Sequence, residues 1–225
     1  MIPRIVFLFD VDNTLLDNDA IIKELGAYMT TKLGAARSKR YWEIFEECRS
    51  ELGYADYLGA LQNYRRESPH DPQLITISAF LLNYPFKEKL FEGAISVLHY
   101  VRKFGSALIL TDGDVVFQPL KIHRSGIFNA VLGNVLIYVH KEQEVEDLER
   151  RFPADHYVFV DDKIRLLTAF KKVLGPRVTT VFPKQGHYAS DKDVPTYPAA
   201  DYTINHISEM LTLTADIVSK INNNR

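Results

Sequence analysis

The residues best suited to chemistry in this sequence are pairs of polar side chains that directly follow apolar runs. The pairs are Asp10 and Asp12 after 4–9, Thr111 and Asp112 at the end of 106–112, and Asp161 and Asp162 at the end of 156–162. Such runs are typical of central parallel strands, whose carboxyl ends meet at one edge of a sheet. Five carboxylates there would repel each other unless a cation lies among them. Hard oxygen ligands shared with water and phosphate suit Mg²⁺, so we expect a magnesium site.

A lysine is expected to complete this site. If Asp12 keeps its proton, the other metal-ligating aspartates, Asp10 and the pair at 161 and 162, carry three negative charges. A magnesium ion and one lysine would balance them and leave the site neutral before a dianionic phosphate arrives. The predicted lysine is Lys141, in the loop or helix start after the apolar run 129–132, and Lys121 is the alternative.

The strand-like runs alternate with helical patterns along much of the chain. Further strand candidates are 129–132, 177–182 and 201–204. Amphipathic patterns at 93–105, 115–126 and 164–175 each end on a glycine, as helices often do. Alternating strands and helices predict an α/β fold with a doubly wound parallel sheet.

Residues 19–84 interrupt this alternation with four consecutive helical patterns and no convincing strand. They predict an all-helical insertion after the first strand. We therefore expect a core domain formed by 1–16 and 88–225, and a helical cap domain at 17–87.

Three segments carry a family resemblance: "FDVDNTLLD" (9–17), "LILTD" (108–112) and "VFVDDK" (158–163). They resemble, in order, the first, second and fourth motifs of the haloacid dehalogenase-like (HAD) phosphohydrolase superfamily. The resemblance implies a HAD-like Rossmannoid core with a helical cap. Two positions depart from the family pattern: Asp112 stands where relatives often have Asn, and Lys141 is followed by Glu142 where many have Pro.

The resemblance, together with the charges, predicts the catalytic roles. An aspartate is ionised at neutral pH, so Asp10 can attack phosphorus without a base and form an aspartyl-phosphate. Asp12 is expected to point the same way as Asp10 and to keep its proton beside the charge of Asp10. It would protonate the leaving oxygen and later take a proton from water. An acid at position 12 favours phosphate esters over dehalogenation, because halide leaves without a proton.

The remaining site residues are expected to bind phosphate or metal. Thr111 and Lys141 would hold phosphoryl oxygens and neutralise their charge, with Asp112 beside them. The resemblance implies that magnesium is bound by Asp10, by the backbone carbonyl of Asp12 and directly by Asp162, with Asp161 acting through water. Asp161 and Asp162 could also cap a helix.

Two further segments complete the predicted site. Thr14 is expected to support the loop around Asp10. In the loop 184–191, His187 and Tyr188 could overhang the substrate, but a plain exposed loop is favoured.

The composition is that of an ordinary globular protein. The net charge of −2 indicates no nucleic-acid or membrane partner, and the single cysteine, Cys48, predicts a reducing, cytoplasmic environment. The sequence thus predicts a Mg²⁺-dependent phosphatase acting on a small phosphorylated metabolite. A phosphomutase and a non-catalytic phosphate-binding protein are the alternatives, and the sequence carries no signal for the oligomeric state.

Overall fold

A computed structural model describes residues 4–223 and shows one six-stranded sheet in the order β3-β2-β1-β4-β5-β6. Every neighbouring pair of strands is parallel. The strands are β1 (Ile5–Phe9), β2 (Ser106–Asp112), β3 (Val135–Tyr138), β4 (His156–Val160), β5 (Val178–Pro183) and β6 (Tyr202–Ile204). The predicted α/β class with a parallel sheet is confirmed.

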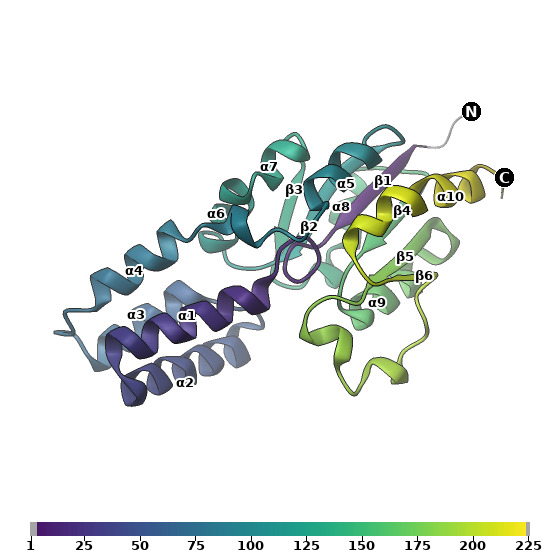
Figure 1. Cartoon of the computed structure of the whole chain (residues 1–225). Helices are drawn as coiled ribbons and strands as arrows, with labels where there is room; N and C mark the ends of the chain where they lie inside the picture. Colours follow the sequence, from purple (N-terminus) through teal and green to yellow (C-terminus); the bar gives the residue numbers. More distant parts are fainter. Residues whose placement is uncertain (1–3, 224–225) are drawn as a thin grey trace.

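Helices cover both faces of the sheet because alternate side chains of each strand point to opposite sides. Phe7 of β1 packs in one apolar core and Leu8 in the other. The first core contains residues of α5 (Ala94–Val101), α6 (Phe117–Ser125), α7 (Ile127–Ala130) and α10 (Met210–Asn223), and the second contains residues of α8 (Val145–Arg151) and α9 (Ile164–Leu174). Figure 1 shows α5 and α10 on the near face of the sheet.

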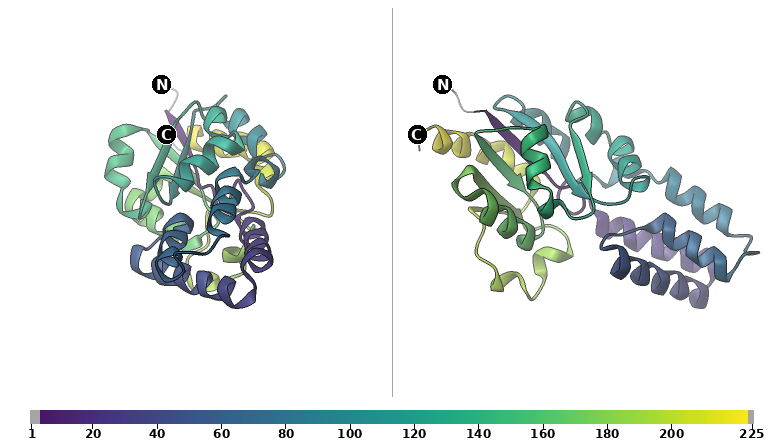
Figure 2. Two further views of the ribbon diagram at one scale, coloured as in Figure 1. Left: turned by 90° about the vertical axis from the view of Figure 1, so that its left-hand side faces the viewer. Right: turned by 180° about the vertical axis from the view of Figure 1, so that it is seen from behind.

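Four consecutive helices lie between β1 and β2. They are α1 (Asn18–Leu33), α2 (Ala35–Leu52), α3 (Tyr57–Glu67) and α4 (Leu74–Asn83). Figures 1 and 2 show them as a separate layer beyond the carboxyl ends of the strands. These helices fall within the range predicted for the cap, and the division into two domains stays a prediction.

The strand predicted at 129–132 is wrong. Its first residues belong to α7, and Leu132 and Gly133 then take positive φ angles of 55° and 77°, which end any extended segment. The third strand is Val135–Tyr138, and β2 pairs with it in parallel. The apolar run was too short to distinguish a strand from a helical turn.

The predicted helix ends agree with the structure at two of three glycines. Gly126 and Gly175 cap α6 and α9 with positive φ angles of 87° and 57°. Helix α5 instead ends at Val101, before Gly105. A Cβ at Gly105 would lie 2.2 Å from the backbone oxygen of Ile5, so this glycine permits close approach to β1.

The helices of residues 4–223 include none that is both long enough and apolar enough to span a bilayer.

Candidate active site

The site lies where the strand order reverses, at the carboxyl ends of β1 and β4. Phe9 pairs with Val160 in the register of these strands, and the Asp10 backbone N–H donates to the Val160 oxygen at 3.0 Å. This places Asp10 and Asp161, the next residues along, side by side at the sheet edge. Open α/β sheets bind ligands at such a switch point.

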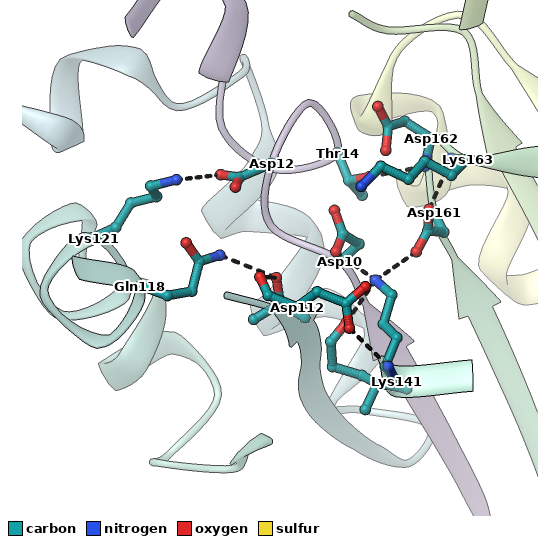
Figure 3. A network of polar contacts seen from close by, with 12 residues as sticks. Asp10, Asp12, Thr14, Asp112, Gln118, Lys121, Lys141, Asp161, Asp162 and Lys163 are labelled. Atoms are coloured by element: carbon teal, nitrogen blue, oxygen red, sulfur yellow. Dashed lines mark hydrogen bonds and ion pairs between the residues drawn. The ribbon is translucent and has the colours of Figure 1, made fainter. Parts of the chain in front are cut away.

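Three buried carboxylates gather there. Oxygens of Asp10, Asp161 and Asp162 lie within 4.8 Å of one another. The Asp162 backbone N–H donates to the Thr14 hydroxyl at 3.1 Å, so the loop after β1 is held against the end of β4 (Figure 3). Thr14 thus supports the loop, as predicted.

Lys141 is the lysine within this acidic cluster. It begins a short 3₁₀ turn, Lys141–Gln143, after β3, and its ammonium lies 2.5 Å from Asp10 Oδ1 and 2.7 Å from Asp161 Oδ2. It also donates to the Leu110 carbonyl at 3.1 Å. Burial lowers the pKa of Lys141, but Asp10, Asp161 and Asp112 raise it more, so the lysine stays charged.

The acidic pair that follows β4 is costly to ionise as it stands. Burial raises the pKa of Asp161 to about 6, although Lys141 partly offsets this effect. Burial and the charges of Asp161 and Asp10 raise the pKa of Asp162 well above its usual value. Neither oxygen of the Asp162 carboxylate has a hydrogen-bond partner within residues 4–223. A divalent cation with a preference for oxygen ligands would fit this donor set.

Asp12 is directed away from Asp10. Its carboxylate forms an ion pair with Lys121, with Oδ1 2.7 Å from the ammonium, and Lys121 also donates to the Asn18 side chain at 3.2 Å (Figure 3). The sequence led us to expect that Asp12 keeps its proton because of the charge on Asp10. That expectation did not take Lys121 into account. Lys121 is therefore tied to Asp12 and Lys141 to Asp10.

The end of β2 brings Thr111 and Asp112 to the same edge. The Gln118 side-chain amide donates to the Thr111 hydroxyl at 3.0 Å. Asp112 Oδ1 accepts the backbone N–H of Lys141 at 2.8 Å, which joins β2 to the turn carrying that lysine. Burial raises the pKa of Asp112, while Lys141 acts against this rise.

Sequence reasoning assigned no role to Lys163, which the structure places at the site. It follows the acidic pair directly. Burial lowers the pKa of Lys163, but Asp10 and its neighbours raise it by more, so the pKa is raised overall. The only available signal was its position within "VFVDDK", next to two aspartates.

The loop 184–191 reaches the site from the end of β5. The His187 ring nitrogen Nδ1 lies 2.6 Å from Asp19 Oδ1, at the start of α1. The Tyr188 ring centroid lies 4.7 Å from the Lys163 ammonium. The loop is therefore partly exposed, as favoured, but it also contacts the site.

A cavity of about 690 Å³ lies between the strand ends and the inserted helices α1, α2 and α3. Asp12, Asp112 and Lys163 line it from the core, and Trp42 and Tyr57 line it from α2 and α3. The cavity is large enough for a small organic substrate.

Comparison with solved structures identifies the family. A protein described as a haloacid dehalogenase-like hydrolase from Burkholderia xenovorans is 52% identical, with a TM-score of 0.90, over 95% of this chain and 97% of that chain. This chain belongs to the haloacid dehalogenase-like hydrolases. No protein-family model and no curated protein matches the sequence.

More distant HAD-like structures share the fold. L-2-haloacid dehalogenase from Xanthobacter autotrophicus, with chloropropionic acid covalently bound, is 13% identical over 93% of this chain and 98% of that chain, with a TM-score of 0.59. The HAD-type hydrolase YfnB from Bacillus subtilis, bound to magnesium, is 15% identical over 93% and 98%, with a TM-score of 0.60. The buried acidic cluster suits the active site of a HAD-like hydrolase.

Proposed function

We propose that this HAD-like hydrolase is a Mg²⁺-dependent phosphatase that acts on a small phosphorylated substrate through an aspartyl-phosphate on Asp10. The observation that carries the proposal is the buried Asp162 carboxylate, which has no hydrogen-bond partner among the described residues and lies beside Asp10 and Asp161. Leaving such a group unpaired costs several kcal/mol, on the order of 2–7 for a neutral polar group and more for a charge. The magnesium bound by YfnB supports the choice of metal.

Asp10 and Asp162 would hold the ion directly, with Asp161 as a further ligand through water and the Asp12 backbone carbonyl as predicted from the sequence. When bound, Mg²⁺ would neutralise charge on the transferring phosphoryl group. Lys141 orients Asp10 through its 2.5 Å contact and keeps one Asp10 oxygen fixed.

In the first step the Asp10 carboxylate attacks phosphorus, and the bond between phosphorus and the ester oxygen breaks. The leaving oxygen takes a proton from Asp12. Lys121, 2.7 Å from Asp12, stabilises the carboxylate that this transfer leaves behind.

In the second step Asp12 takes a proton from water, and the resulting hydroxide attacks the phosphorus of the aspartyl-phosphate. The bond from phosphorus to Asp10 breaks, inorganic phosphate leaves, and both aspartates return to their starting states.

Asp12 supports ester hydrolysis over dehalogenation. An alcohol leaving group needs a proton, whereas a halide does not. Asp12 lines the cavity, where its carboxyl group can exchange this proton with a leaving oxygen.

The test is release of inorganic phosphate from phenyl phosphate and a panel of phosphorylated metabolites, with Mg²⁺ or a chelator. We expect turnover that chelation and Asp10→Asn both abolish. Asp216→Asn, an exposed aspartate on α10, is the matched control and should keep full activity.

Other outcomes would contradict the proposal. Phosphate transfer to a sugar faster than to water would indicate a phosphomutase. Binding of Mg²⁺ and BeF₃⁻ without turnover of any substrate would indicate a non-catalytic protein. Chloride release from 2-chloropropionate would indicate a dehalogenase.

A further inference from the structure

The ammonium group of Lys141 is engaged by the protein itself. It donates hydrogen bonds to Asp10 Oδ1 at 2.5 Å and to the Leu110 carbonyl at 3.1 Å. It also forms an ion pair with Asp161 Oδ2 at 2.7 Å. With its side chain 1% exposed, Lys141 fixes the two aspartates from within the core.

Lys163 is in the opposite situation. Its backbone N–H donates to Asp161 Oδ1 at 2.8 Å, but within residues 4–223 its ammonium forms no hydrogen bond or ion pair. In Figure 3 the Asp10 carboxylate lies between the ammonium groups of Lys141 and Lys163. Lys163 also lines the cavity that a ligand would enter.

The ammonium of Lys163 is held in position by the loop after β5. The Tyr188 ring, 4.7 Å from the ammonium, provides a cation–π contact. Tyr188 packs on His187, with ring centroids 3.9 Å apart, and His187 pairs with Asp19 on α1. The contact orients the cation without using its N–H donors.

The charge of the site also calls for a second cation. Asp112, which is unusual for the family, joins Asp10, Asp161 and Asp162 as a fourth carboxylate. Lys141 and a divalent ion supply three positive charges and would leave the site negative toward a phosphate dianion. The charge of Lys163 acts on Asp112 and brings the sum to neutrality.

We propose that Lys163 is a substrate-binding cation of this site: its ammonium donates to phosphoryl oxygens, while Lys141 positions Asp10 and Asp161. This inference rests on the proposed function, because it concerns the same phosphoryl group. It also accounts for Asp112, whose charge Lys163 compensates.

The test measures binding of inorganic phosphate by calorimetry in the presence of Mg²⁺. Lys163→Met should weaken phosphate binding about 10- to 100-fold, the loss expected for a charge-assisted hydrogen bond. Lys163→Arg should recover most of the affinity. Lys172→Met, an exposed lysine on α9, should bind phosphate as the wild type does. Far-UV circular dichroism checks that the variants are folded.

Two results would overturn the inference. Unchanged phosphate affinity in a folded Lys163→Met protein would do so. If this variant binds Mg²⁺ more than about 10-fold tighter and its phosphate affinity is unchanged, Lys163 merely occupies the position of the metal ion. Because phosphate binding needs no turnover, a wild type that binds phosphate but hydrolyses no ester would refute the proposed function alone.

A double variant tests the compensation of Asp112. Asp112→Asn removes the extra negative charge, so Asp112→Asn/Lys163→Met should bind phosphate more tightly than Lys163→Met. Equal affinities of the single and double variants would refute the compensation.

Discussion

At the scale of single residues, the site is organised by two buried lysines with different partners. Lys141 and Lys121 each have a side chain that is 1% exposed. Lys141 neutralises buried carboxylates, whereas the Asp12 side chain paired with Lys121 is 30% exposed. Water can therefore solvate Asp12 when its lysine is removed, but it cannot reach Asp10 and Asp161 in the same way.

We therefore expect Lys141→Met to lower the free energy of unfolding by about 3–5 kcal/mol, the cost of breaking a buried ion pair. Lys121→Met should lower it by much less. Chemical denaturation at neutral pH without Mg²⁺ measures both. Equal losses would show that the two lysines have equivalent environments.

The raised pKa values of the acidic pair predict how stability depends on pH. Because burial raises the pKa of Asp161 to about 6, the folded protein binds more protons than the unfolded chain between about pH 4 and pH 6. The free energy of unfolding contributed by this group therefore falls as the pH rises through that range. Above it, the ionised carboxylates are costly in the absence of a metal.

Mg²⁺ should consequently raise the Tm more at about pH 7.5 than at about pH 5, where protons compete with it. Thermal unfolding with and without Mg²⁺ at both pH values checks this. Asp162→Asn should lose most of the response to Mg²⁺. The same Tm increase at both pH values would be inconsistent with metal binding to these carboxylates.

At the scale of elements, the site depends on the interlocking of two loops. Asn13, in the loop after β1, has a φ of 59° and accepts the backbone N–H groups of Asn18 and Asp19 at 3.1 and 3.2 Å. The loop after β5 packs directly on it: a Cβ at Gly186 would lie 2.4 Å from Asn13 Cγ. The absence of a side chain at Gly186 is therefore needed for the loop that carries Asp12.

Two glycines provide a matched comparison. Gly186 and Gly175 have positive φ angles of 68° and 57°, but a Cβ at Gly175 would meet no atom within 4 Å. Gly175→Ala should cost about 1–3 kcal/mol for backbone strain alone. Gly186→Ala should cost at least about 1 kcal/mol more through overpacking, and should lower activity by displacing Asn13.

Denaturant unfolding and phosphate release measure these two effects. Equal stabilities of the two alanine variants, with full activity in both, would show that Asn13 can move aside without loss of stability or activity.

At the scale of the whole molecule, the inserted helices α1, α2 and α3 and the core share one cavity, and aromatic side chains connect the two parts. Phe45 of α2 stacks on Tyr57 of α3 with centroids 4.8 Å apart, and Tyr57 contacts Phe117 of α6 at 5.2 Å. Trp42 lines the same cavity and is the single tryptophan of the chain. A ligand at the strand ends should therefore contact both parts of the molecule.

Trp42 emission should report this contact. We expect phenyl phosphate with Mg²⁺, added to the Asp10→Asn variant, to change the intensity of tryptophan fluorescence in a saturable way. Trp42→Phe in the same background controls for signal from other sources. Constant emission during binding seen by calorimetry would show that α2 does not reach the bound ligand.

The sequence by itself determined the parallel sheet and the order of its strand-end acids. Apolar runs such as 5–9 and 107–110 are buried on both faces, and their composition alone indicates this. Asp10, Thr111 and Asp161 then follow at the same edge, because all carboxyl ends of a parallel sheet point one way. The strand β3 was not placed although Val135–Tyr138 is itself an apolar run, because the neighbouring run 129–132 was assigned as the strand and short apolar runs fit either a strand or a helical turn.

Only the tertiary structure decided which charged groups meet. Along the chain, Lys141 was the predicted lysine of the site and Lys121 the alternative. The packing of α6 and of the turn after β3 assigns these lysines to different aspartates. Packing likewise placed the Lys163 ammonium beside Tyr188, with no ion pair among residues 4–223. Electrostatic pairing depends on the distance between charged groups in space. For segments that are far apart in the sequence, tertiary packing sets this distance, and local sequence patterns do not predict it.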